Sequence, residues 1–188
     1  MSINSLMQDI FNDLGKDEKT SFVEIDITDD ILKIANFKAK DMGHLNKSIM
    51  RGEGNLAGFL GEECLKKYFG LKLGTEENTY DYDLIYFGER IDVKSKKTSV
   101  IPRFNHECSV AALNTKQNCD YYIFTRVLFE LDVAKKVYIM GYSKKSDYYK
   151  NARFLKKGDI DGSNKFIVRE DCYNMYYSDL SSVEELKK

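Results

Sequence analysis

A change of hydrophobic period after residue 82 is the sequence feature that most constrains the fold. Before this point, residues 56–69 place apolar side chains at helical spacing, and Gly70 follows as a stop signal. After it, residues 84–87 form a short apolar and aromatic run and residues 90–95 alternate polar and apolar side chains, and both patterns are typical of strands. A helix followed by a hairpin predicts a fold in which helices pack on a sheet.

The hairpin also predicts which side chains share a face. A two-residue turn at Gly88-Glu89 pairs Asp83 with Lys94, and Ile85 with Asp92. Because side chains alternate along a strand, Asp83, Asp92 and Lys94 are expected on one face of the sheet. The opposite face is apolar and is expected to pack on the core; it carries Leu84, Tyr86, Ile91 and Val93.

Two carboxylates and a lysine on one face form a set that chemistry can use. Nearby carboxylates repel each other unless a positive charge lies between them. Hard oxygen ligands suit Mg²⁺ or Mn²⁺, and such a metal can activate water for attack on a phosphodiester. A neighbouring lysine can stabilise negative charge in the transition state. The alternative is a solvent-facing aspartate and lysine that make an ordinary cross-strand pair.

The other segments predict an α/β fold with a mixed central sheet flanked by helices. Strands are expected over 22–28, 121–129, 136–142 and 165–169, and helices over about 29–43, 109–117, 143–151 and 181–188. Residues 1–20 are expected to form an acidic arm or a short helix. Residues 21–188 are expected to form a single domain, since a chain of this length suits one core.

These motifs resemble the PD-(D/E)XK nuclease superfamily. The resemblance rests on Gly61-Glu62 in a helix, Tyr82-Asp83-Leu84-Ile85, and Ile91-Asp92-Val93-Lys94. It covers residues 54–97, and the stretch from Gly54 to Glu62 is similar to the helix of small members, some of them phage-encoded. The likeness implies a restriction-endonuclease-like core. It also implies that Asp83 and Asp92 are metal ligands, that Glu62 binds the metal directly or through water, and that Lys94 is the catalytic lysine.

The match leaves two alternatives open. Tyr82 stands where many members have proline, and Asp81, which has the same strand parity, could replace Asp83 as ligand. Glu63 could replace Glu62, although helical spacing and the small Gly61 favour Glu62 close to the sheet.

Several polar residues around these motifs are candidates for nucleic-acid contacts. Residues 90–117 carry six basic residues against two acidic ones, within a chain of net charge −1. A local basic stretch can hold a phosphate backbone, and a solvated surface is the alternative. The candidates are Lys96, Lys97, Arg103, Lys116, Gln117, Arg51 and Asn55. Lys116 and Gln117 resemble polar residues that relatives place beside the active site, while Asn55 could instead cap its helix.

We therefore expect a Mg²⁺- or Mn²⁺-dependent deoxyribonuclease, with endonuclease preferred to exonuclease. By the likeness, its products carry 5′-phosphate ends. The rivals are a non-catalytic nucleic-acid-binding or regulatory protein on the same fold, and an unrelated α/β interaction module. Nucleases that cut both strands are commonly dimers, so a homodimer is a further expectation. The four cysteines form no CxxC pair, and no signal-peptide pattern or apolar membrane span occurs, so a cytoplasmic location is expected.

Overall fold

The computed structural model describes residues 22–43, 55–75, 80–162 and 165–187. The acidic arm expected over residues 1–20 lies outside these ranges. In chain order the elements are β1 (Val23–Asp26), α2 (Asp29–Gly43), α3 (Asn55–Tyr68), β2 (Leu84–Tyr86), β3 (Glu89–Thr98), β4 (Glu107–Ala111), η1 (Ala112–Lys116), β5 (Tyr121–Glu130), β6 (Val133–Lys144), α4 (Lys145–Asn151), β7 (Arg153–Leu155), β8 (Cys172–Tyr176), η2 (Tyr177–Asp179) and η3 (Val183–Leu186).

Two sheets organise the chain. The larger has five strands in the order β1-β6-β5-β3-β2, and the smaller has three in the order β4-β8-β7. Within the larger sheet β3 and β5 are parallel and the remaining pairs are antiparallel. The predicted α/β fold with a mixed central sheet is therefore confirmed.

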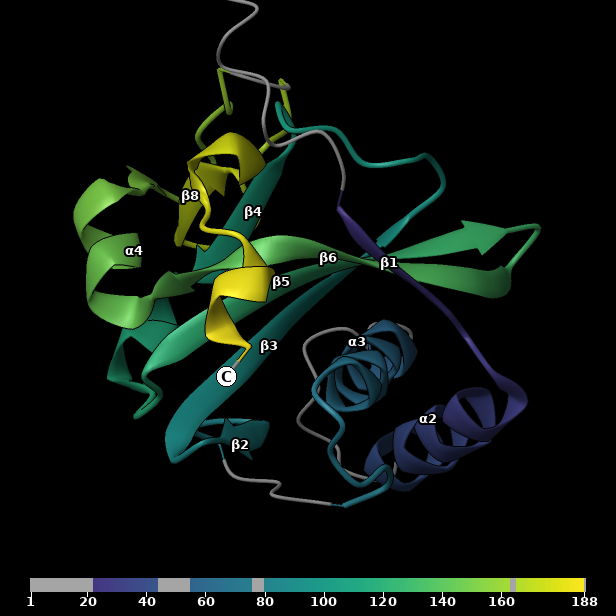
Figure 1. Cartoon of the computed structure of the whole chain (residues 1–188). Coiled ribbons are helices and arrows are strands. Elements are labelled where there is room, and N and C mark those ends of the chain that lie inside the picture. The colour runs from purple at the N-terminus through teal and green to yellow at the C-terminus, as the bar shows by residue number, and fades with distance from the viewer. Residues whose placement is uncertain (1–21, 44–54, 76–79, 163–164, 188) are drawn as a thin grey trace, which may run out of the picture.

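The larger sheet is covered on both faces. Helices α2 and α3 lie on one face, and β4, β8 and α4 lie on the other (Figure 1). Each side has its own apolar core: Leu60, Leu65 and Val93 belong to the helical side, and Phe124 and Tyr148 to the side of the small sheet. Side chains that alternate along β3 therefore enter two different environments.

The β2–β3 hairpin turns one residue earlier than predicted. Its turn residues are Phe87 and Gly88, and both have positive φ (49° and 85°), as a primed hairpin turn requires. Leu84 consequently pairs with Ile91, and the predicted pair of Ile85 with Asp92 does not form. The shift moves every partner by two residues, and because faces alternate with period two, the predicted faces are unchanged.

Three further predicted elements differ from the structure. The helix expected over 109–117 is wrong, because its first residues form β4 and only a 3₁₀ turn follows. The strand expected over 165–169 is also wrong: Ile167 makes only an isolated bridge with Ile160, and the strand β8 follows later. The terminal helix is reduced to the 3₁₀ turn η3.

Gly61 lets α3 approach the sheet closely. A Cβ atom built on Gly61 would lie 2.1 Å from Ser95 Oγ on β3 and 2.6 Å from Thr125 Oγ1 on β5. These two hydroxyls are joined by a 2.7 Å hydrogen bond beneath the helix. The helix therefore rests on the sheet at a point where any side chain would displace it, and the next residue, Glu62, is held near β3.

We predict that Gly61→Ala lowers the free energy of unfolding by about 1–3 kcal/mol, the usual cost of overpacking. Rotating Ser95 away would relieve the clash but break its bond with Thr125. Gly58→Ala on the same helix is the matched control, because its Cβ would meet nothing within 4 Å. This control should raise stability by about 0.5–1 kcal/mol. Urea unfolding followed by circular dichroism measures both, and equal stability of Gly61→Ala and the parent chain would contradict the prediction.

Candidate active site

Asp92 is a buried carboxylate whose two oxygens face different partners. Its Oδ1 accepts a hydrogen bond from Gln117 Nε2 at 3.0 Å. Its Oδ2 forms an ion pair with Lys94 Nζ at 2.5 Å and makes no further bond with a described residue. Because a carboxylate oxygen has more than one lone pair, Oδ2 keeps an acceptor site for a further cation or donor.

Gln117 fixes the relative positions of Asp92 and Lys94. It follows η1 directly, is only 6% exposed, and its Nε2 also donates to the backbone oxygen of Tyr80 at 2.8 Å. Its Oε1 accepts from Lys94 Nζ at 3.3 Å. A single amide therefore contacts both ionic groups and holds their orientation, as the sequence resemblance implied for this residue.

Asp83 caps the exposed edge of β3. Strand β2 begins only at Leu84, and no described strand pairs with β3 beyond it on that side. The Oδ2 atom of Asp83 accepts the backbone N–H of Val93 at 2.6 Å. This bond replaces a missing ladder hydrogen bond and brings Asp83 beside the residue that follows Asp92.

Glu62, on α3, lies close enough to Asp83 and Asp92 for the charges of these groups to interact. Its side chain is half-buried and makes no hydrogen bond with a described residue. Burial raises the pKa of Glu62 to about 7, against the opposing effect of Lys66 and Lys38. The negative charges of Glu63 and Asp92 raise this pKa further.

The two strand carboxyls are perturbed in the same direction. Burial, followed by the charges of Glu62 and Asp92, raises the pKa of Asp83 well above its usual range, and the Val93 N–H opposes this. Burial also raises the pKa of Asp92, with Lys94 and Gln117 opposing. Three carboxyls that disfavour each other's ionisation form a group that a bound cation would stabilise.

Asp81 and Glu63, the two alternative ligands, are engaged elsewhere. Asp81 Oδ1 accepts the backbone N–H of Asn118 at 2.9 Å. Glu63 is fully buried in an ion triad with Lys38 (2.9 Å) and Lys66 (3.0 Å), and Lys38 belongs to α2. These contacts favour Asp83 and Glu62 for the site, and give Glu63 the role of joining the two helices.

A cleft opens beside Lys94. It has a volume of about 220 Å³ and lies between α3, β3 and β4, where β3 has no neighbouring strand. Gly58, Lys94, Lys96 and Ser109 are among its lining residues. The carboxyls of Glu62, Asp83 and Asp92 do not line this cleft. Lys94 is therefore the candidate catalytic residue that faces it.

The other predicted contact residues are dispersed. Lys96 follows Lys94 on the same face and bonds the hydroxyl of Ser109. Lys97 points to the opposite face, over the Phe129 ring at 4.4 Å. Arg103 and Lys116 are exposed, in the loop before β4 and in η1. Arg51 and the side chain of Asn55 lie outside the described residues, and all these nucleic-acid contacts stay predictions.

Lys145 and Tyr122 belong to the site but escaped the sequence analysis. Lys145, the first residue of α4, donates to the backbone oxygen of Gln117, and its charge lowers the pKa of Asp92. Lys94 Nζ lies 5.5 Å from the centre of the Tyr122 ring. The only sequence signal for Tyr122 was that alternation along β5 places its side chain on an inward-facing side of the sheet. Lys145 had none, because its approach depends on the pairing of β5 with β6.

The donor set fits a magnesium-type ion held partly by water. Among the described ranges, no group of three or more His, Cys, Asp or Glu side chains is arranged to hold a metal ion. Mg²⁺, however, is usually bound by only one or two carboxylates and keeps several waters. The carboxyls of Asp92 and Asp83 are of the kind that could supply those ligands, and Glu62 lies close enough to both for its charge to interact with theirs.

Comparison with protein-family models and with curated protein sequences finds no match for this chain. No described helix has the length and apolar character needed to cross a bilayer. The assignment of the site therefore rests on its residues and their geometry.

We predict that the metal-free protein loses stability as the pH rises from about 4.5 to 7. The pKa of Glu62 is about 7 in the folded chain and ordinarily 4.5, so the folded state binds the proton more tightly in this window. The contribution of Glu62 to the free energy of unfolding is therefore greatest below pH 4.5. By pH 8 this contribution has fallen by at most about 3 kcal/mol.

Glu62→Gln is the matched variant, since it keeps the shape and removes the titration. Its unfolding free energy should fall less between pH 5 and pH 8, as measured by urea unfolding in EDTA. Added Mn²⁺ should restore stability to the parent protein at pH 8. An unchanged pH slope in Glu62→Gln would show that Glu62 is not the perturbed group.

Proposed function

We propose that this chain is a metal-dependent nuclease that hydrolyses phosphodiester bonds in DNA. One observation carries the proposal: the buried Asp92 is ion-paired with Lys94, and its charge raises the pKa of the neighbouring carboxyls Glu62 and Asp83. Natural cores avoid such an arrangement because it costs stability. A site that binds a divalent cation and a phosphate gives the arrangement a use.

The protein groups have distinct roles in this mechanism. Asp83 and Asp92 would hold Mg²⁺ or Mn²⁺, with Glu62 as a direct or water-mediated ligand. When bound, such an ion polarises a phosphoryl oxygen and lowers the pKa of a bound water. Lys94 faces the cleft and stabilises negative charge that develops on the phosphate. Gln117 keeps Lys94 and Asp92 in register.

Membership of the PD-(D/E)XK superfamily is part of the same proposal. It is supported by the order helix, hairpin, strand, by the Gly61 contact, and by the common face of Asp92 and Lys94. By that likeness the products carry 5′-phosphate ends. We prefer an endonuclease to an exonuclease, and a homodimer is the oligomer to test.

We predict that the purified chain cleaves DNA with Mn²⁺, and that Asp92→Asn or Lys94→Met lowers the rate by about 100-fold or more. Nicked, linear, circular and single-stranded DNA are assayed side by side. Lys135→Met is the control for Lys94→Met, because Lys135 is an exposed lysine of β6 that lines neither cavity; it should cleave as the parent does. Thermal midpoints check that each variant folds.

Asp81→Asn and Asp83→Asn form a second matched pair. Loss of cleavage in the Asp83 variant alone would identify the ligand, whereas loss in the Asp81 variant alone would reverse the assignment. A parent protein that binds DNA and cuts none of the four substrates would instead favour the non-catalytic function on this fold.

A further inference from the structure

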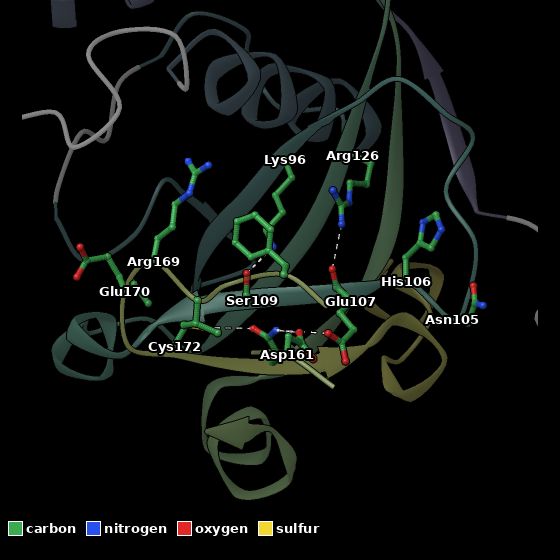
Figure 2. A pocket seen from close by; sticks show the side chains of 14 residues that line it. Lys96, Asn105, His106, Glu107, Ser109, Arg126, Asp161, Arg169, Glu170 and Cys172 are labelled. Carbon is green, nitrogen blue, oxygen red and sulfur yellow. Dashed lines mark hydrogen bonds between the residues drawn. The ribbon is translucent and has the colours of Figure 1, made fainter. Parts of the chain in front are cut away.

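A second cavity continues from the cleft beside Lys94. It has a volume of about 560 Å³, in the range of small-molecule sites, and shares Lys96 and Ser109 with that cleft. Lys96 and Arg126 project into it from β3 and β5 towards β4, and Asp161 lies on its floor (Figure 2). A chain bound at Lys94 could thus extend directly into this space.

Three cations line the cavity without forming an ion pair with a described residue. Lys96 bonds only the hydroxyl of Ser109. Arg126 donates to the backbone oxygen of Glu107 at 3.0 Å and to the phenol of Tyr177 at 2.6 Å. The third cation, Arg169, lies 5.4 Å from the centre of the Phe166 ring.

The acids of the same cavity are each paired with a cation outside its lining. Glu107 and Asp161, both buried, pair with Arg153, at 3.7 Å for Asp161. Glu170 pairs with Lys157 at 3.1 Å. Since Glu107 and Asp161 share the single cation Arg153, the three acids are met by two cations outside the lining and three in it, so positive charge is in excess by two.

Lys96 and Arg126 are direct neighbours in the sheet. They occupy paired positions on the parallel strands β3 and β5 and point to the same face. Like charges placed opposite each other on adjacent strands repel. Burial, and then the charge of Arg126, lower the pKa of Lys96 to about 8. An anion between the two side chains would remove this repulsion.

The spacing of the lysines matches a nucleic-acid strand. Lys94 and Lys96 are two residues apart on one face, which separates their Cα atoms by roughly 7 Å. Neighbouring phosphates of an extended strand have a similar separation. Phe166 is 52% exposed at the cavity wall, with Arg169 5.4 Å from the centre of its ring, and aromatic rings and arginines of this kind stack with bases.

We infer that this cavity binds one unpaired nucleotide of the DNA substrate, adjacent to the scissile phosphate. Its phosphate lies between Lys96 and Arg126, and its base packs against Phe166. The inference rests on the nuclease function proposed above, and it adds that the protein engages DNA that is single-stranded at this position.

The test measures binding apart from cleavage. In an Asp92→Asn background with EDTA, fluorescence anisotropy gives the affinity for a short labelled single-stranded oligonucleotide. Lys96→Met should weaken binding about tenfold and reduce the salt dependence by about one phosphate contact. Lys135→Met, at an exposed lysine of β6 that lines neither cavity, should bind within about twofold of the background.

Phe166→Ala tests the base contact, with the exposed Phe37→Ala on α2 as control. Phe166→Ala should weaken binding about tenfold, and the control should not. With an abasic oligonucleotide, which keeps the phosphates, Phe166→Ala should have no effect. Both residues are more than half exposed, so the variants are expected to fold, and thermal midpoints verify this.

Oligonucleotide affinity that is unchanged in both Lys96→Met and Phe166→Ala would overturn the inference, even if the parent protein cleaves DNA. A second result would also overturn the inference. In it, a deoxynucleoside 5′-monophosphate binds in the cavity, as shown by NMR shifts that are lost in Lys96→Met, but does not displace the oligonucleotide. A parent protein that binds the oligonucleotide through Lys96 and Phe166 but cuts no DNA would retain the nucleotide site and refute the proposed catalysis.

Discussion

The contact of α3 with the sheet at Gly61 is the constraint on which the rest of the structure depends. Because Gly61 has no side chain, the helix rests on the bonded hydroxyls of Ser95 and Thr125. Consecutive acids then have opposite roles. Glu62 is directed to the edge of β3 and Glu63 to the ion triad with α2, so one helical position fixes both the candidate site and the packing of the helices.

The face of each hairpin side chain could be predicted from sequence, but the turn could not. The polar dipeptide Gly88-Glu89 favoured a turn one residue later than the observed Phe87-Gly88, since an aromatic residue at positive φ is uncommon. The face on which a side chain lies depends only on alternation along the strand, and a change of every strand pairing by two residues leaves that face the same. The meeting of Asp92 and Lys94 was therefore predictable even though their cross-strand partners were not.

Long-range pairing accounts for what sequence could not predict. Residues 109–111 read as the start of a helix because their burial as a strand depends on β8, some sixty residues later in the chain. The same holds for Lys145 beside Gln117 and for the cavity between β3, β5 and the small sheet. Local periodicity carries no information about such neighbours, whereas Gln117 was found because the family resemblance supplied it.

The bond from Val93 N–H to Asp83 has a consequence for self-association. Beyond β2 the outer side of β3 has no strand partner among the described residues, and an open strand edge is a template for pairing with another chain. The Asp83 side chain takes up the Val93 N–H on that edge, and so removes one of the donors that such pairing would need. Substituting a residue that cannot accept this hydrogen bond would leave the N–H open to an added strand.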